Sequence, residues 1–85
     1  MWCVFEFSQT NGDGERKLIE SVRREVNSIS HAKMLAASTM KHTKIRGRIA
    51  DFSVIKDKKG QFICVVDQSA YRKSIWTRTI APPLY

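Results

Sequence analysis

The spacing of apolar residues changes along this chain, and that change restricts the fold more than any other feature. Residues 2–7 alternate, with Cys3, Phe5 and Phe7 on one side, which predicts an opening β-strand. Residues 30–40 repeat apolar side chains every three or four positions, which predicts a helix. After this segment the alternation returns. Strand, helix and further strands in this order predict a single small α+β domain, with helix packed on one face of a sheet.

Residues 15–27 are compatible with two structures. Apolar residues recur there at helical spacings, and Arg16, Glu20 and Arg24 follow one another four positions apart, which stabilises a helix. A strand would place Glu20 and Arg24 on the same side as Val22. We therefore predict a helix over 15–27, and a strand stays open as the alternative.

Two turn signals divide the rest of the chain. Residues 11–14 read Asn-Gly-Asp-Gly, and residues 57–60 read Asp-Lys-Lys-Gly, which favours a hairpin. Residues 44–55 predict a strand with a bend near its middle. Residues 62–66 are apolar on both sides, which predicts a central strand, and residues 75–80 alternate again. The prediction is an N-terminal strand, a central helix or helices and a C-terminal three-stranded antiparallel sheet.

The whole net charge of +7 lies in the second half of the chain. Residues 1–40 carry five basic and five acidic side chains, whereas residues 41–85 carry ten basic and three acidic ones. The composition, 42% hydrophobic, is that of one folded domain over residues 1–85. This uneven distribution of charge between the two halves of the chain predicts a polyanionic partner, either nucleic acid or an acidic protein surface.

The predicted strand at residues 44–49 gives that partner a candidate surface. Its alternation would align Lys44, Arg46 and Arg48 on one face about 7 Å apart, close to the phosphate spacing of a nucleic-acid strand. Tyr71 and Trp76 are candidates to stack on bases or on Arg planes, although a lone tryptophan such as Trp76 is more often a core anchor. Lysines and arginines are also common on any solvated face, but the lack of acidic compensation here favours binding. The predicted partner-binding or nucleic-acid-binding residues are Lys41, His42, Lys44, Arg46, Arg48, Lys56, Lys58, Lys59, Tyr71, Arg72, Lys73, Trp76 and Arg78.

No residue pattern predicts catalysis, a metal or a cofactor. His31, His42, Cys3 and Cys64 lack metal-ligand spacing, and the phosphate-binding glycine patterns are absent. A small toxin-type ribonuclease, which works with Arg, Lys, His and Tyr side chains, is the least favoured alternative, because the C-terminal basic-aromatic run of such toxins is not matched here residue by residue. The residues with suitable chemistry are His42, Asp51, Asp57, Lys59, Arg72 and Tyr85.

The expected location is the cytoplasm. No apolar run approaches the ~20 residues that span a bilayer, and the first residues lack the basic start of a signal peptide. We therefore expect no membrane partner, and free thiols at Cys3 and Cys64, with a bridge between neighbouring strands as the alternative. A homodimer stays open, because an uncovered sheet edge can pair with a second copy.

Residues 27–38 read Asn-Ser-Ile-Ser-His-Ala-Lys-Met-Leu-Ala-Ala-Ser, and Ser28 or Ser30 is expected to cap the helix. This segment resembles the serine-started helix of small phage-encoded proteins, in particular a group of type I-F anti-CRISPR proteins. The resemblance implies an antiparallel sheet packed on one helix, with residues 20–27 as a strand. It also implies inhibition by occupying the DNA-binding surface of the Cascade complex. We expect a non-enzymatic protein that docks on a host nucleic-acid-processing or defence complex and blocks nucleic-acid access, with direct DNA or RNA binding as the alternative.

Overall fold

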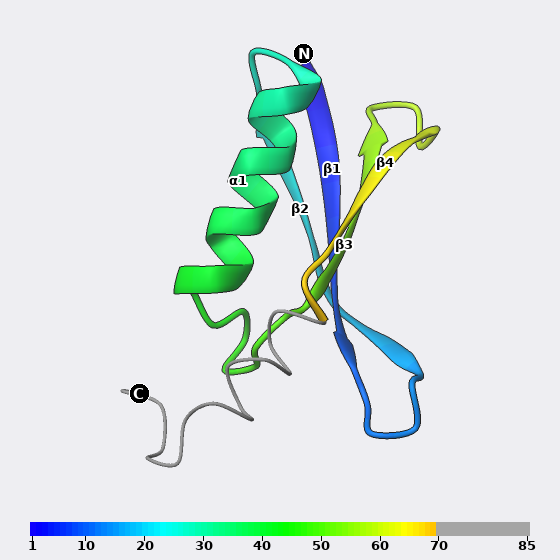
Figure 1. Cartoon of the computed structure of the whole chain (residues 1–85). Helices are drawn as coiled ribbons and strands as arrows, with labels where there is room; N and C mark the ends of the chain where they lie inside the picture. Colours follow the sequence, from blue (N-terminus) through cyan, green and yellow to red (C-terminus); the bar gives the residue numbers. More distant parts are fainter. Residues whose placement is uncertain (70–85) are drawn as a thin grey trace.

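Four antiparallel strands and one helix make up residues 1–69, the part of the chain that the computed structural model describes (Figure 1). The strands form one sheet in the order β2-β1-β3-β4. The α+β class is confirmed, but the sheet is continuous from the N-terminal strand onward, and β1 lies inside it rather than apart. The elements are β1 (Trp2–Thr10), β2 (Arg16–Glu25), α1 (Ile29–His42), β3 (Phe52–Asp57) and β4 (Phe62–Asp67).

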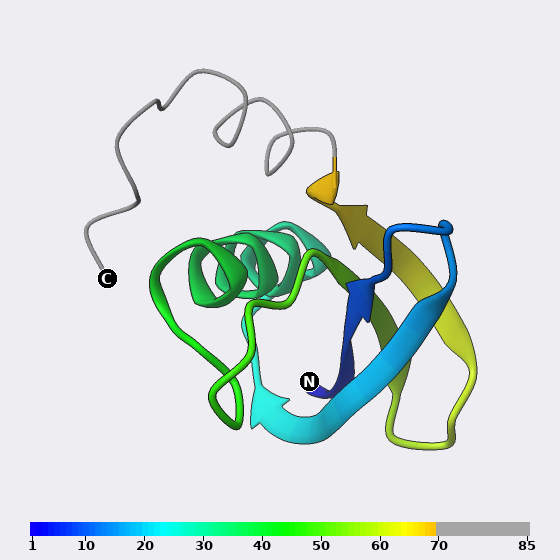
Figure 2. The same ribbon diagram turned by 90° about the horizontal axis from the view of Figure 1, so that it is seen from below.

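The core lies between α1 and one face of the sheet (Figure 2). The alternation of β1 turns Phe5 and Phe7 to this face, and their rings stack with centroids 6.2 Å apart. The buried residues of α1, Ala32, Ala36 and Met40, follow one another four positions apart. Because alanine side chains are short, this stripe lets the helix axis approach the sheet closely. The predicted opening strand and the predicted helix are both confirmed.

A capping arrangement starts α1 at the expected serine. The Ser28 side chain accepts a hydrogen bond from the His31 backbone N–H at 3.0 Å. His31 Nδ1 in turn accepts one from the Asn27 backbone N–H, also at 3.0 Å. The first contact satisfies an N-terminal backbone donor that the helix itself leaves without a partner, and the second holds the residue before the cap to the first turn. Ser28, not Ser30, is therefore the cap.

The helix predicted over residues 15–27 is wrong, because this segment forms strand β2. Residues of β2 pair in antiparallel register with β1, so that Val22 lies opposite Phe5 and Glu20 opposite Phe7. Glu20 and Arg24 share a side with Val22, as the strand alternative requires. The two charges are tolerated there because β2 is an edge of the described sheet and both side chains reach solvent.

The strand predicted over residues 44–49 is also wrong. Ile45 and Arg48 close a tight turn, in which each backbone N–H donates to the carbonyl oxygen of the other residue, at 2.8 and 3.0 Å. Arg46 and Gly47 both have positive φ, 51° and 75°, as in a type I′ turn. The three cations at 44, 46 and 48 are therefore not aligned along a strand.

The second hairpin has the predicted turn, since the Gly60 N–H donates to the Asp57 carbonyl oxygen at 3.0 Å. Its second strand, β4, was expected at the centre of the sheet, but it is the edge next to β3 within residues 1–69. One side of β4 packs on the core, whereas Phe62 and Val65 on its other side are exposed within the described residues. The strand predicted over residues 75–80 lies outside the described residues.

Both cysteines within the described range are free thiols, as expected. Cys3 is on β1 and Cys64 on β4, with β3 between them. Two strand spacings separate the residues by roughly 10 Å, too far for a disulfide. The alternative of a bridge between neighbouring strands is therefore wrong. Burial raises the pKa of the Cys3 thiol.

Candidate polyanion-binding site

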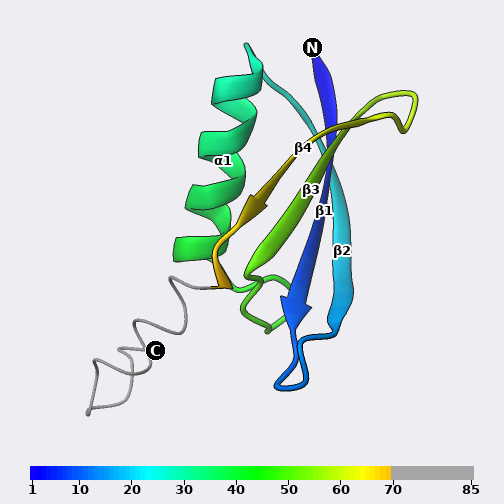
Figure 3. The ribbon, with the colours of Figure 1, turned by 45° about the vertical axis from the view of Figure 1, so that its right-hand side comes forward.

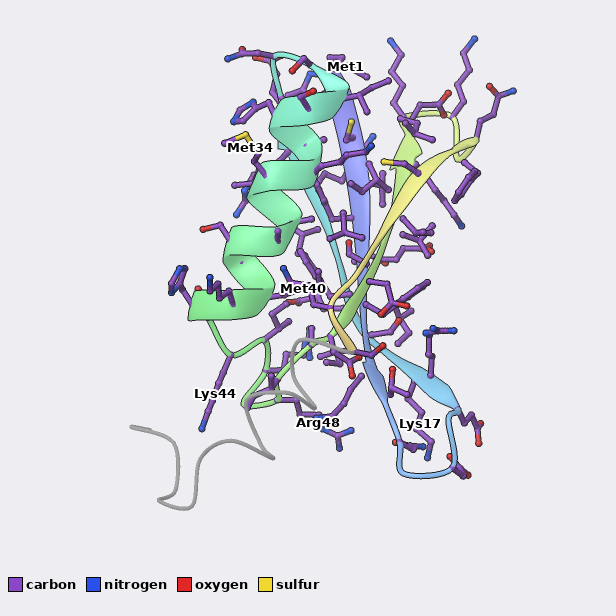
Figure 4. All side chains as sticks on the ribbon, in the orientation of Figure 1. Met1, Lys17, Met34, Met40, Lys44 and Arg48 are labelled. Atoms are coloured by element: carbon purple, nitrogen blue, oxygen red, sulfur yellow. The ribbon has the colours of Figure 1, made fainter. Side chains whose placement is uncertain are left out.

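The last turn of α1 and the Ile45–Arg48 turn bring a group of basic side chains to one end of the molecule. All of them are exposed. Figure 4 shows Lys44 and Arg48 pointing away from the body of the protein at this end. We call this group the basic end; its members are Lys41, His42, Lys44, Arg46 and Arg48.

The helix terminus itself favours cations at this place. Lys41 and His42 occupy the last turn of α1, where the helix dipole is negative. The Thr43 N–H donates to the Thr39 carbonyl oxygen at 2.9 Å and ends the helix, and the Thr39 hydroxyl donates to the Leu35 carbonyl oxygen at 2.7 Å. The dipole thus contributes to holding positive charge at the start of the following loop.

The turn that follows is fixed to the sheet. Arg46 Nε donates to Glu20 Oε1 at 3.0 Å, which ties the turn to β2. Ile45, 7% exposed, is buried as the apolar anchor of the turn. Gln9 donates from its side chain to the Ile49 carbonyl oxygen at 3.1 Å, which holds the loop to β1. The loop therefore presents Arg46 and Arg48 from a defined position.

The carboxylates named as catalytic candidates are engaged in structural contacts. Asp51 is buried, and its Oδ1 accepts hydrogen bonds from the Thr10 backbone N–H at 2.9 Å and the Thr10 hydroxyl at 3.0 Å. Asp57 Oδ1 accepts from the backbone N–H groups of Lys59 and Gln61, at 2.8 and 2.9 Å. Both carboxylates thus stabilise loops. Arg72 and Tyr85, the other candidates apart from His42 and Lys59, lie outside the described residues.

The single basic surface predicted from the sequence is divided between two ends. Lys58 and Lys59, here called the hairpin tip, lie between β3 and β4, at the opposite end of the sheet from the Ile45–Arg48 turn (Figures 1 and 3). Lys56 pairs with Glu6 at 3.2 Å on the sheet face away from α1. The predicted positions Tyr71, Arg72, Lys73, Trp76 and Arg78 lie outside the described residues.

A cleft between α1 and β2 opens beside the basic end. Its volume is about 250 Å³, and Phe5, Phe7 and Val22 give it an apolar floor. Arg24 and Lys44 are among the charged residues that line it. The sequence did not predict this cleft, because it exists only where β2 is a strand.

The sheet face away from α1 carries exposed apolar side chains. Arg16 crosses this face, with its guanidinium carbon 3.9 Å from the centre of the Phe52 ring and an ion pair to Asp67 at 3.4 Å. Hydrogen bonds from the Ser69 backbone and hydroxyl, with Arg16 as a smaller cause, hold the pKa of Asp67 below its ordinary value. The large exposed apolar residues of the strands are Trp2, Leu18, Phe62 and Val65.

Within residues 1–69, no group of three or more His, Cys, Asp or Glu side chains is arranged to hold a metal ion. In the same range no helix has the length and apolar character needed to cross a membrane.

No protein-family model, curated protein or solved structure matches the chain.

Proposed function

We propose that this chain is a non-enzymatic binding protein that docks through its basic end on a host nucleic-acid-processing or defence complex and blocks nucleic-acid access. The observation that carries the proposal is the concentration of Lys41, His42, Lys44, Arg46 and Arg48 in one exposed helix terminus and turn. Positive charge gathered at one place steers association with a polyanionic surface. The fold, an antiparallel sheet packed on one helix, is also the one that the resemblance to type I-F anti-CRISPR proteins implies.

The shape of the basic end favours docking over tracking along a nucleic-acid strand. Lys44, Arg46 and Arg48 are grouped around a tight turn and not spaced along a strand at phosphate intervals. A compact cluster matches a local acidic patch, whereas strand tracking uses an extended groove with stacking side chains. Direct DNA or RNA binding is the second candidate, because the same cations would also contact phosphates.

Affinity capture from a nuclease-treated host extract tests the proposal. The wild-type chain should retain a nucleic-acid-processing complex, and the purified complex should lose nucleic-acid binding when the chain is added. Lys44→Glu with Arg48→Glu should abolish both effects, whereas Lys58→Glu with Lys59→Glu at the hairpin tip should preserve them. Salt-sensitive binding to free DNA or RNA, without such a complex, would instead support the second candidate.

A further inference from the structure

Strand β2 is an uncovered edge of the described sheet (Figure 3). It pairs with β1 on one side only, and most of its residues are exposed. A β-bulge beside Ile19 interrupts its register with β1, because Phe7 lies opposite Glu20 but Ser8 opposite Leu18. Such a bulge bends a strand, so the regular part of this edge runs from Glu20 to the end of β2 at Glu25.

The hydrogen bonds at the start of the chain show which backbone groups of this edge face outward. Met1 and Val26 exchange two bonds, from the Met1 amino group at 2.9 Å and from the Val26 N–H at 2.8 Å. Bonded pairs alternate along an antiparallel ladder. The backbone groups of Glu20, Val22 and Arg24 therefore face β1, and those of Ser21 and Arg23 face away from the sheet.

The side chains on the α1 side of β2 have a self-complementary order. From Glu20 through Val22 to Arg24 they read acidic, apolar, basic. If a second copy of β2 pairs antiparallel about Val22, each Glu20 lies opposite an Arg24 of the other copy, and the two Val22 side chains meet. In the same register Ser21 and Arg23 of the two copies exchange backbone hydrogen bonds. In the single chain Arg24 Nη1 donates to the Arg23 carbonyl oxygen at 3.0 Å, and in the dimer the Ser21 N–H of the second copy replaces this exposed contact.

Neighbouring registers lack this match. A shift that centres the pairing on Ser21 places Glu20 opposite Val22, and a shift that centres it on Arg23 places two Arg23 side chains opposite each other. Charged side chains commonly protect edge strands from pairing. Here their order favours the pairing centred on Val22, because opposite charges across strands stabilise a sheet, whereas the Arg23-centred register brings like charges together and the Ser21-centred register gains no ion pair.

We propose that the chain forms a two-fold homodimer through antiparallel pairing of β2 with β2 of a second copy, centred on Val22. The two sheets become continuous, and both α1 helices lie on the same face. The paired segment is short, so the interface belongs to the small, weak class below about 1,200 Å². The dimer is therefore concentration-dependent. This inference does not depend on the proposed docking function.

Sedimentation velocity of the full chain, from micromolar to millimolar concentration, tests the dimer. Glu20→Arg and Arg24→Glu each place like charges opposite one another, and each should weaken self-association roughly tenfold. An equimolar mixture of these two variants should associate again, because the two acidic side chains of one variant then face the two basic side chains of the other. A wild-type chain that stays monomeric over the whole range, or a mixture that does not associate, would overturn the proposal.

Two further variants separate pairing from folding. Arg46→Gln removes the contact with Glu20 in the same chain, which competes with Arg24 of the second copy for this carboxylate, and leaves the backbone of β2 unchanged. Dimerisation should therefore persist or strengthen. Arg23→Pro removes an outward N–H and no hydrogen bond to β1, so it should abolish the dimer while circular dichroism still shows the native fold. A folded Arg23→Pro variant that dimerises like the wild type would also contradict pairing through β2.

Discussion

Arg46 Nε donates to Glu20 Oε1 over 3.0 Å, and this contact joins the turn of the basic end to the edge strand β2. Both partners reach solvent, so the pair contributes little to stability, about 0–1 kcal/mol. Its consequence is positional, because it holds the Arg46 guanidinium at Glu20 of β2, whereas Arg48 points away from the body of the protein (Figure 4).

The backbone of this turn gives the first prediction. Gly47 has φ of 75°, where a side chain is unfavourable, so Gly47→Ala should lower the free energy of unfolding by about 1–2 kcal/mol. Gly12→Ala is the matched control, because no atom lies within 4 Å of an added Cβ there and its φ is not in the left-handed range. Urea denaturation of both variants checks this; equal stability would contradict the type I′ turn.

The buried carboxylate of Asp51 gives the second prediction. Asp51→Ala leaves the Thr10 N–H and hydroxyl without their acceptor, which should cost about 1–3 kcal/mol. Asp13→Ala, in the exposed β1–β2 turn, removes an acceptor for the Glu15 N–H and should change stability by no more than about 0.5 kcal/mol. Thermal or urea unfolding distinguishes the two. A smaller effect at Asp51 than at Asp13 would show that Asp51 does not hold the loop.

A third prediction concerns a buried hydroxyl. Ser53 lies in the core opposite Phe7, and its Oγ makes no hydrogen bond within residues 1–69. Ser53→Ala removes this unsatisfied group and should raise the free energy of unfolding by about 1 kcal/mol. Ser21→Ala, at an exposed position of β2, should be neutral. A loss of stability in Ser53→Ala would mean that the hydroxyl has a partner.

Acid unfolding gives a fourth prediction. The pKa of Asp67 lies below the ordinary value of an aspartate, because the Ser69 backbone and hydroxyl hydrogen bonds favour the charged carboxylate. The resulting stability is present above the unfolded-state pKa and is lost as the pH falls through the folded-state value. Asp67→Asn should therefore lower the urea midpoint at neutral pH and reduce the further loss between about pH 5 and pH 2. An unchanged pH dependence in this variant would exclude the Ser69 contacts as its source.

The sequence was sufficient for elements whose signals are local. The opening strand predicted over residues 2–7 and the turn at Asp57–Gly60 each depend on residues close in the chain. The helix cap is also local, but the sequence left Ser28 and Ser30 open and the structure assigns Ser28. The segment of β2 was not predictable in this way, because Leu18, Val22 and Val26 fit a helical spacing as well as a strand. Pairing with β1, a tertiary interaction, decides for the strand.

The candidate site was predicted in composition but not in shape. The charge pattern identified Lys44, Arg46 and Arg48, yet their arrangement depends on positive φ at Arg46, which an arginine rarely adopts. The distance of the hairpin tip from the basic end depends on the direction in which β3 runs from the Ile45–Arg48 turn. Residue spacing encodes neither the backbone conformation at Arg46 nor the distance between the hairpin tip and the basic end. The basic residues predicted as one surface therefore lie on two separate surfaces.

Heparin-affinity chromatography of two charge-matched variants tests most directly whether the basic end is the polyanion-binding surface. Lys44→Glu with Arg48→Glu changes the net charge by the same amount as Lys58→Glu with Lys59→Glu at the hairpin tip. If the basic end binds, the first variant elutes at much lower salt than the wild type, and the second elutes close to it. Equal shifts for both variants would show that net charge alone governs binding, and would contradict the account.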